Sequence, residues 1–278
     1  MSLTGRALKA GVMGWPIGHS LSPALHGWWL AQYRIDGTYL PMAVQPRDLA
    51  TALRALPILG FAGCNLTIPH KEAALALVDR VDPVAQRIGA VNTIVVDGDG
   101  ALEGRNTDAY GFIASLRAAQ PGWSGRRGPA VLIGAGGSTR ALIVALLEDG
   151  APEIRVVNRT LERAEALAAE FGTLIRPVAW TERAEALGDA ALLVNTTSQG
   201  MTGEPPLDLP LDRLPLAAIV NDIVYAPLET PLLAAARRRG NPVVDGLGML
   251  LHQARPGFAA WFGVEPEVTA ELCAAVLA

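Results

Sequence analysis

The chain has 278 residues, half of them hydrophobic, and is therefore long enough for two medium domains with their own cores. Its net charge of −4 and its two cysteines, Cys64 and Cys273, argue against a basic surface for nucleic acid or anionic membranes, a disulfide framework and a cysteine-rich zinc site. Because the N-terminus lacks the apolar core of a signal peptide and no apolar run approaches about 18 residues, we expect a cytoplasmic protein without a membrane span.

Short apolar runs alternate with helical patterns over the first 110 residues, which predicts an α/β domain. We expect strands at 8–14, 38–44 and 63–68, and helices at 22–35, at 46–56 and from about Lys71. The turn sequence Asp-Gly-Asp-Gly at 97–100 predicts a hairpin. After a helix at 108–119, the Gly- and Pro-rich residues 120–129 are interpreted as a loop between domains.

The second half alternates strands and helices at the spacing of βαβ units. It begins with a fully apolar strand, a glycine turn and a helix over 130–150 and continues to about residue 249. This pattern predicts a doubly wound parallel sheet that binds ligands at the carboxyl ends of its strands. We expect a last helix, near 248–263, to lie beyond that sheet and to pack on the first domain.

The glycine turn is Gly134-Ala135-Gly136-Gly137, between a strand and a helix. Glycines there allow a tight turn and let a pyrophosphate approach the N–H groups of a helix N-terminus. The third glycine position of the dinucleotide motif holds Thr139, so a tight turn without a ligand stays an alternative.

The end of the next strand reads Asn158-Arg159-Thr160, where an NAD enzyme would carry an Asp or Glu for the ribose hydroxyl. An arginine offers a planar fork to a 2′-phosphate, so the expected cofactor is NADP. The alternative is that Arg159 only pairs with a surface carboxylate such as Glu162.

Short polar residues occur at the expected strand ends of the first domain. They suit a small polyhydroxylated ligand, because each buried hydroxyl needs a hydrogen-bond partner. Ser20 and Ser22 also have a simpler interpretation as helix N-caps before Pro23. The set comprises Ser20, Ser22, Asn65, Thr67, Asn92, Asn106 and Asp108.

The sequence resembles the shikimate dehydrogenase family along nearly its full length. The matching blocks are HSLSP (19–23), NLTIPHK (65–71), GAVNT (89–93), NTD (106–108), GAGGSTRA (134–141), NRT (158–160), NTTSQGM (195–201) and DGLGMLLHQA (245–254). The resemblance implies an α/β substrate domain over 1–111, completed by C-terminal helices at 247–278, and a Rossmann NADP-binding domain over 112–246, separated by a cleft. It also implies the reversible NADPH-dependent reduction of 3-dehydroshikimate to shikimate, a step towards aromatic amino acids.

The same resemblance implies a role for each matching residue. Lys71 and Asp108 would be the catalytic pair, and both would also bind substrate. Ser20 and Ser22 would bind the substrate carboxylate. The other parts of the substrate, mainly its ring hydroxyls, would contact Asn65, Thr67, Asn92, Tyr225 and Gln253. The cofactor would contact Gly134, Ala135, Gly136, Gly137, Asn158, Arg159, Thr160, Thr196, Met201, Ile223, Gly246 and Met249. Two positions depart from the family: Gly27, where asparagine is common, and Ala109, where glycine is usual.

The protonation state of Lys71 in catalysis stays open at this stage. A lysine in water is a ready acid but a poor base at neutral pH. Burial would favour the amine, whereas an ionised aspartate beside it would favour the ammonium. We therefore expect Lys71 to transfer the proton and stabilise charge, with Asp108 orienting it.

Other functions are less consistent with these residues. A related oxidoreductase could accept quinate or an aminoshikimate, and a non-catalytic sensor could keep the fold. A serine hydrolase using Ser20 or Ser22 with His19 or His26 lacks the G-x-S-x-G elbow. The four histidines show no metal-ligand spacing, so no metal is expected, and His70 is interpreted as a supporting or surface residue. Expected partners are small molecules only, with the chain a monomer or homodimer.

Overall fold

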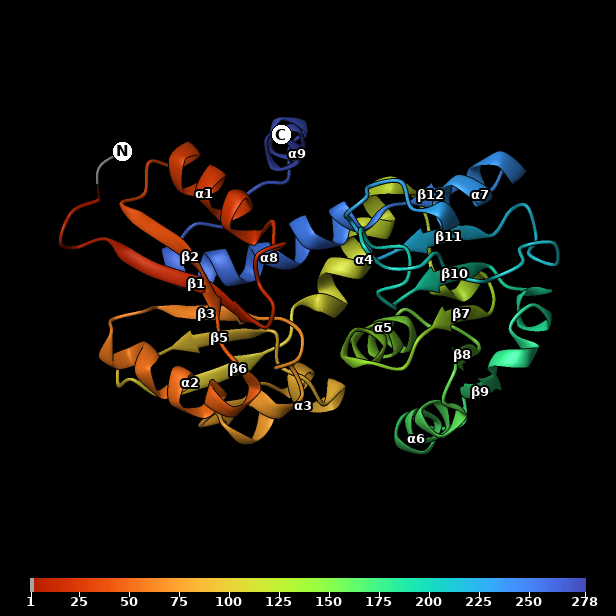
Figure 1. Ribbon diagram of the computed structural model, residues 1–278, viewed down its shortest axis with the longest axis horizontal. Coiled ribbons are helices and arrows are strands. Elements are labelled where there is room, and N and C mark those ends of the chain that lie inside the picture. Colours follow the sequence, from red (N-terminus) through yellow and green to blue (C-terminus); the bar gives the residue numbers. More distant parts are fainter. Residues whose placement is uncertain (1–2) are drawn as a thin grey trace. The chain divides into compact units, whose positions relative to one another are not determined.

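The computed structural model describes residues 3–278 and contains two compact units, each with a six-stranded sheet (Figure 1). Unit 1 comprises the chain up to Asp108 together with Leu251–Ala278, and unit 2 comprises Ala109–Leu250. The sequence analysis placed these divisions after residue 111 and after residue 246. In the structure both divisions fall within helices, α4 (Asp108–Ala119) and α8 (Gly246–Phe262).

The sheet of unit 1 has the strand order β2-β1-β3-β5-β6-β4. β1 pairs in parallel with β2 and β3, whereas β5 is antiparallel to β3 and β6. The strands are β1 (Leu8–Gly14), β2 (Gly37–Ala43), β3 (Gly63–Leu66), β4 (Arg80–Val81), β5 (Thr93–Val96) and β6 (Leu102–Arg105). The β5–β6 hairpin closes through the predicted turn at 97–100, where the Gly100 N–H bonds the Asp97 carbonyl.

The helices of unit 1 come from both ends of the chain. In Figure 1 the blue ribbons of α8 and α9 lie among the red elements of this unit. From Leu251 onward the chain groups with this unit, on which the sequence predicts that the last helix packs. The α-helices are α1 (Ser22–Gln32), α2 (Leu49–Ile58), α3 (Pro83–Ile88), the last part of α8, and α9 (Ala270–Leu277), with 3-10 helices at Pro46–Asp48 and Ala73–Ala76.

The two faces of this sheet have different roles because successive side chains of a strand alternate. Cys64 and Leu66 of β3 pack into the hydrophobic core on the α2 side. Gly63 and Asn65 point to the other face, where a Cβ at Gly63 would meet Trp261 Nε1 at 2.3 Å. Glycine at 63 therefore lets α8 approach the strand, and Asn65 becomes a buried polar group on that face.

The prediction of an α-helix from about Lys71 is wrong, because the chain forms only the 3-10 helix Ala73–Ala76 there. The carbonyl of Lys71 accepts a hydrogen bond from the Val91 N–H, and the Leu75 N–H bonds the carbonyl of Glu72 instead. Because β4 begins soon afterwards, too few residues remain to offset the cost of starting an α-helix.

Unit 2 has an all-parallel sheet with the order β12-β11-β10-β7-β8-β9. Numbered within the unit, this is the 3-2-1-4-5-6 order of a doubly wound fold, as predicted. The elements are β7 (Ala130–Ile133), α5 (Gly137–Glu148), β8 (Ile154–Asn158), α6 (Leu161–Phe171), β9 (Ile175–Ala179), β10 (Leu192–Asn195), β11 (Ile219–Asp222), α7 (Pro231–Arg239) and β12 (Val243–Val244), with 3-10 helices at Gly125–Arg127, Trp180–Glu182 and Glu185–Leu187.

The loop at 120–129 does not lie between the two units, as the sequence analysis interpreted it, but within unit 2. The carboxylate of Asp149 explains this, because it forms an ion pair with Arg117 of α4 and accepts a hydrogen bond from the Gly125 N–H. Trp123 is buried as well. These contacts attach the loop and the preceding helix to the β7–α5 layer.

None of the helices within the described part of the chain is long and apolar enough to cross a membrane.

Candidate active site

The side chains of Lys71 and Asp108 form an ion pair in unit 1, with 2.5 Å between Nζ and Oδ2. Their side chains are 17% and 6% exposed. Lys71 follows β3, and Asp108 is the first residue of α4, where the helix dipole favours a carboxylate. The lysine is therefore not the ordinary solvated charge that its residue type suggests.

Asn92 joins this pair to its surroundings. Its Nδ2 lies 2.8 Å from Asp108 Oδ1, 3.0 Å from Thr107 Oγ1 and 3.4 Å from Gln253 Oε1. The Thr107 N–H donates to Asn92 Oδ1 at 2.9 Å. Residues predicted from four separate sequence blocks thus meet in one hydrogen-bonded cluster.

Asn106 links the backbone of Asp108 to that of Ala90. Its Oδ1 accepts from the Asp108 N–H at 3.0 Å, and its Nδ2 donates to the Ala90 carbonyl at 2.8 Å. Its amide groups are thereby used within the protein, and they fix the start of α4.

Asn65 belongs to a second, adjoining network. Its Nδ2 donates to the Asn92 carbonyl and to Thr93 Oγ1, both at 3.1 Å, and its Oδ1 accepts from the Tyr39 hydroxyl at 2.6 Å. Neither Tyr39 nor Thr93 was among the predicted site residues, although Thr93 is the last residue of the GAVNT block. Tyr39 lies in β2, two strands away from Asn65 in the sheet, and no sequence block indicated it.

The two predicted serines do not cap α1 through their side chains. The N-cap residue is Leu21, and Ser20 Oγ accepts a 3.3 Å hydrogen bond from the Ser22 N–H. Ser22 is buried and Ser20 half-buried. Thr67 is half-buried too, and its methyl group fills the space that a Cβ at Gly14 would enter. Neither serine is therefore the N-cap residue, although Ser20 Oγ bonds the N–H of the first helical residue.

The buried histidines have supporting positions. His70 is 1% exposed, with Nε2 2.9 Å from the Val44 carbonyl, so its interpretation as a possible surface residue is wrong. His26 is buried, and burial lowers its pKa to about 3. Within residues 3–278 neither ring nitrogen of His26 has a hydrogen-bond partner, which gives no support to a serine–histidine pair. Over the same residues, no group of three His, Cys, Asp or Glu side chains is arranged to hold a metal ion.

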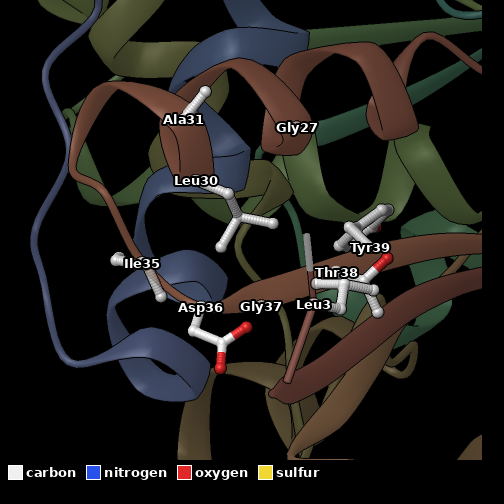
Figure 2. Close-up of a pocket in the computed structure, with 9 residues that line it drawn as sticks. All are labelled: Leu3, Gly27, Leu30, Ala31, Ile35, Asp36, Gly37, Thr38 and Tyr39. Carbon is white, nitrogen blue, oxygen red and sulfur yellow. The ribbon is translucent and has the colours of Figure 1, made fainter. Parts of the chain in front are cut away.

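A pocket of unit 1 between α1 and β2 is lined by none of the predicted ligand residues. Figure 2 shows Asp36 there, and its carboxylate already accepts hydrogen bonds from Thr4. Gly27, one of the two departures from the family, lines this pocket, and a Cβ at that position would meet no atom within 4 Å. The departure thus alters the pocket and not the polar cluster.

The glycine turn of unit 2 follows β7, at the point where the strand order reverses. Gly134 has a φ of +116°, and a Cβ there would lie 2.6 Å from Thr196 Oγ1. A Cβ at Gly136 would meet nothing within 4 Å, so the surface before α5 is open. This combination of a tight turn, an open surface and a helix N-terminus suits a pyrophosphate.

Thr139, at the third glycine position, is completely buried and has a specific role. Its Oγ1 accepts from the Gly136 N–H at 3.2 Å and lies 2.7 Å from Thr196 Oγ1. Thr196 in turn donates to the Ile133 carbonyl at 2.7 Å. The hydroxyl thus connects the turn after β7 to the loop after β10.

The end of β8 presents Arg159 and Thr160 as exposed residues beside half-buried Asn158. Asn158 Nδ2 donates to the Thr160 carbonyl at 2.8 Å, which shapes this turn. No ion pair joins Arg159 to Glu162 or to another carboxylate of the described chain. The guanidinium is accordingly available to an anionic ligand.

The loops after β10 and β11 carry two predicted cofactor residues, Met201 and Ile223, and the predicted substrate residue Tyr225. All three are half-buried, and the predicted cofactor residue Met249 of α8 is buried. A Cβ at Gly246 would come within 2.4 Å of the Ile223 carbonyl, so only glycine permits this approach.

Asp222, which the sequence analysis missed, holds these two loops together. Its carboxylate accepts from Asn195 Nδ2 and the Val224 N–H at 3.0 Å, and from Thr230 Oγ1 at 2.7 Å. Burial raises the pKa of Asp222 to about 6, and these hydrogen bonds oppose the shift. An aspartate at the end of a mostly apolar strand was the only signal in the sequence.

The family model for the shikimate dehydrogenase substrate binding domain matches residues 12–94, and the model for shikimate / quinate 5-dehydrogenase matches residues 121–202. A shikimate dehydrogenase (NADP(+)) of Paramagnetospirillum magneticum is 61% identical over 99% of this chain and 100% of its own length.

Solved structures agree with the sequence matches. Shikimate 5-dehydrogenase of Thermus thermophilus, crystallised with NADP(H) and shikimate, is 40% identical, with a TM-score of 0.87 over 97% of this chain and 98% of the other. A quinate dehydrogenase of Corynebacterium glutamicum, in complex with NAD, is 32% identical, with a TM-score of 0.90 over 98% and 99%. The agreement covers both units, and the chain belongs to the shikimate dehydrogenase family.

Proposed function

We propose that this protein catalyses the reversible NADP-dependent reduction of 3-dehydroshikimate to shikimate, in the shikimate pathway of aromatic amino-acid biosynthesis. The observation that carries this proposal is the buried Lys71–Asp108 pair, surrounded by neutral hydrogen-bonding side chains. A charged donor among amides and hydroxyls suits a small, polyhydroxylated substrate with a reducible ketone.

Unit 2 has the features that an NADP-binding domain needs. Gly134, Ala135, Gly136 and Gly137 would hold the pyrophosphate at the start of α5, and Arg159, with Asn158 and Thr160, would hold the 2′-phosphate. When bound, NADPH supplies the hydride that reduces the ketone. Thr196, Met201, Ile223, Gly246 and Met249 would complete the site around the nicotinamide.

Lys71 would act on the substrate oxygen. Reduction of a ketone leaves an alkoxide that must gain a proton, and an ammonium group can both stabilise that charge and donate the proton. Asp108 would orient Lys71 through the 2.5 Å contact and accept a hydrogen bond from a substrate hydroxyl. Asn92 would keep Asp108 in place, because its amide donates to the second carboxylate oxygen.

The remaining polar residues would bind the substrate in unit 1. Ser20 and Ser22 would bind its carboxylate, since their hydroxyls are not needed to cap α1. The hydroxyls and the ring would contact Asn65, Thr67, Asn92 and Gln253. Tyr225, which belongs to unit 2, is proposed as a further substrate contact.

A spectrophotometric assay tests the proposal. Purified protein is expected to oxidise NADPH with 3-dehydroshikimate and to reduce NADP with shikimate, each measured at the nicotinamide absorbance band. Controls without substrate and with NADH establish the specificity. No substrate-dependent change in either direction would refute the proposal and favour a non-catalytic sensor with the same fold.

Quinate with NAD is a second candidate activity, because the structural relative from Corynebacterium glutamicum is a quinate dehydrogenase in complex with NAD. The same assay with quinate and both cofactors separates the two candidates. Arg159 favours NADP, since residues 158–160 at the end of β8 include no carboxylate to accept from a ribose hydroxyl.

We further propose that the protein acts in the cytoplasm as a monomer or homodimer. Size-exclusion chromatography with light scattering tests the oligomeric state, and a tetramer would contradict it.

A further inference from the structure

Tyr39 lies beside Asn65, a residue that is proposed to bind the substrate. Its hydroxyl donates to Asn65 Oδ1 at 2.6 Å. Tyr39 lies in β2 and Asn65 in β3, so this hydrogen bond joins two strands that do not pair with each other. No sequence block of the family pointed to it.

The ring of Tyr39 is held by an aromatic cluster. It stacks on His26 with 3.9 Å between ring centroids and an interplanar angle of 2°. The rings of Trp29 and Trp261 also approach His26. Because burial lowers the pKa of His26 to about 3, the imidazole is uncharged at neutral pH and contributes a flat surface without a charge. Tyr39 therefore has little freedom to turn.

The hydrogen-bond donors of Asn65 can be counted completely. The Asn92 carbonyl can only accept, so it requires an N–H of Asn65, and the second N–H goes to Thr93 Oγ1. Burial and the neighbouring Cys64 raise the pKa of Tyr39, so its hydroxyl is protonated and can donate to Asn65 Oδ1. One lone pair on that oxygen is all the hydrogen-bonding capacity that Asn65 has left.

We propose that Tyr39 is a positioning residue, which holds the side chain of Asn65 so that Asn65 is an acceptor, and not a donor, towards the ligand. This inference rests on the proposed function, because it takes the ligand to be a hydroxylated acid bound near Asn65. It fixes the direction of one hydrogen bond: the ligand must be the donor, and Asn65 Oδ1 the acceptor. A ring hydroxyl or an ammonium group would satisfy Asn65, whereas a fluorine or a methoxy group would not.

The substitution Tyr39→Phe tests this inference, because it keeps the stacked ring and removes the hydroxyl. We expect the KM for shikimate to rise about fivefold to tenfold, since one buried hydrogen bond is lost, while kcat changes less than about threefold. The KM for NADP should stay unchanged. Tyr33→Phe is the matched control, because the Tyr33 hydroxyl accepts from the Glu267 N–H at 3.1 Å, away from the polar cluster, and its kinetics should match wild type.

Substrate analogues separate positioning from a general structural effect. Each non-reacting ring hydroxyl of shikimate is replaced in turn by hydrogen, fluorine or ammonium. At the ring position that contacts Asn65, replacement by hydrogen or fluorine should raise the KM of the wild-type enzyme about tenfold, and replacement by ammonium should raise it much less. With the hydrogen and fluorine analogues, the Tyr39→Phe substitution should raise the KM by less than about a further twofold. An equal loss on shikimate and on every analogue, or no loss on shikimate, would overturn the role of Tyr39.

Two further results keep the test decisive. Wild-type turnover of shikimate is measured first: its absence refutes the proposed function itself, whereas a normal wild type with an unaffected Tyr39→Phe variant refutes only the positioning role. If Tyr39→Phe does not fold, the analogue series on the wild-type enzyme still decides. Equal KM values for fluorine and ammonium at every position would contradict an acceptor-only Asn65.

Discussion

At the scale of single residues, the chain uses lysine sparingly. Its 23 basic residues include only two lysines, Lys9 and Lys71. Arginine stays protonated under all ordinary conditions and therefore does not serve as a general acid or base, whereas lysine can. A lysine at 71, in a chain that otherwise uses arginine, agrees with a group that must both carry charge and transfer a proton.

Substitution of Lys71 should abolish most turnover. We expect Lys71→Met to lower kcat by about 10²- to 10⁴-fold, the usual range for a lost proton-transfer group, with the KM for NADPH nearly unchanged. Lys71→Arg should also fail, although it keeps the charge. Lys9→Met is the control, since Lys9 Nζ bonds only the Leu59 carbonyl in the described structure. Steady-state kinetics measure all three, and near-normal kcat in the Lys71→Met variant would contradict the assignment.

Arg159 should determine the choice of cofactor. Loss of one charge-assisted contact is worth roughly 1.5–3 kcal/mol, so Arg159→Ala should raise the KM for NADP by about 10- to 100-fold and leave use of NAD similar. Arg163→Ala removes an exposed arginine of α6 and should have little effect. Equal losses with NADP and NAD would show that Arg159 does not recognise the 2′-phosphate.

Asp222 should make the stability of the protein depend on pH. Its folded-state pKa of about 6 exceeds the ordinary value of 3.8, so the folded protein binds more protons than the unfolded chain between those two values. The free energy of unfolding therefore falls as pH rises through this window. Relative to Asp222→Asn, wild type should gain about 1 kcal/mol when the pH is lowered from 7 to 5. Urea unfolding at several pH values measures this difference, and a constant difference would show that the carboxyl does not titrate there.

At the scale of elements, the turn after β7 shows that a departure from a motif can be an adaptation. Thr139 occupies a glycine position of the dinucleotide pattern, yet its hydroxyl bonds the Gly136 N–H and contacts Thr196. The turn and the loop after β10 thus depend on a side chain that the motif does not contain.

A substitution that restores glycine at this position of the motif should consequently lower the free energy of unfolding. Thr139→Gly removes a buried hydrogen-bond partner and places glycine in the first turn of α5, at a combined cost of about 2–4 kcal/mol. Thr139→Ser keeps the hydroxyl and should lose much less. Urea unfolding measures both variants. A Thr139→Gly variant as stable as wild type, or with tighter NADPH binding, would contradict this role.

At the scale of the whole molecule, unit 1 is built from both ends of the chain. Trp29 Nε1 of α1 donates to the Glu267 carbonyl at 2.9 Å, and Trp261 Nε1 of α8 donates to the Ile94 carbonyl at 2.9 Å. The last helix, α9, buries Leu272 completely. The proposed substrate cluster includes Gln253 from this returning segment, so the C-terminal helices contribute to the site as well as to the core.

Stability should therefore depend on α9. Leu272→Ala is expected to lower the free energy of unfolding by about 2–5 kcal/mol, as for other fully buried leucines. Leu277→Ala, in the same helix but 47% exposed, should change it by less than about 0.5 kcal/mol. Denaturant unfolding compares the pair, and similar values for both variants would mean that α9 does not belong to the folded core.

The local chemistry and much of the fold can be predicted from the amino-acid sequence alone. Apolar strands, helix patterns and the glycine turn predict the doubly wound sheet because these signals depend on neighbouring residues, and the polar blocks identify Lys71, Asn92 and Asp108. Which residues of distant segments become neighbours is known only from the tertiary structure. The missing helix after Lys71 reflects the carbonyl taken by Val91, and Tyr39, Thr139 and Asp222 gain their roles from hydrogen bonds to residues of other elements. Such contacts leave no periodic pattern in the chain, because burial and partner geometry arise only when distant segments pack.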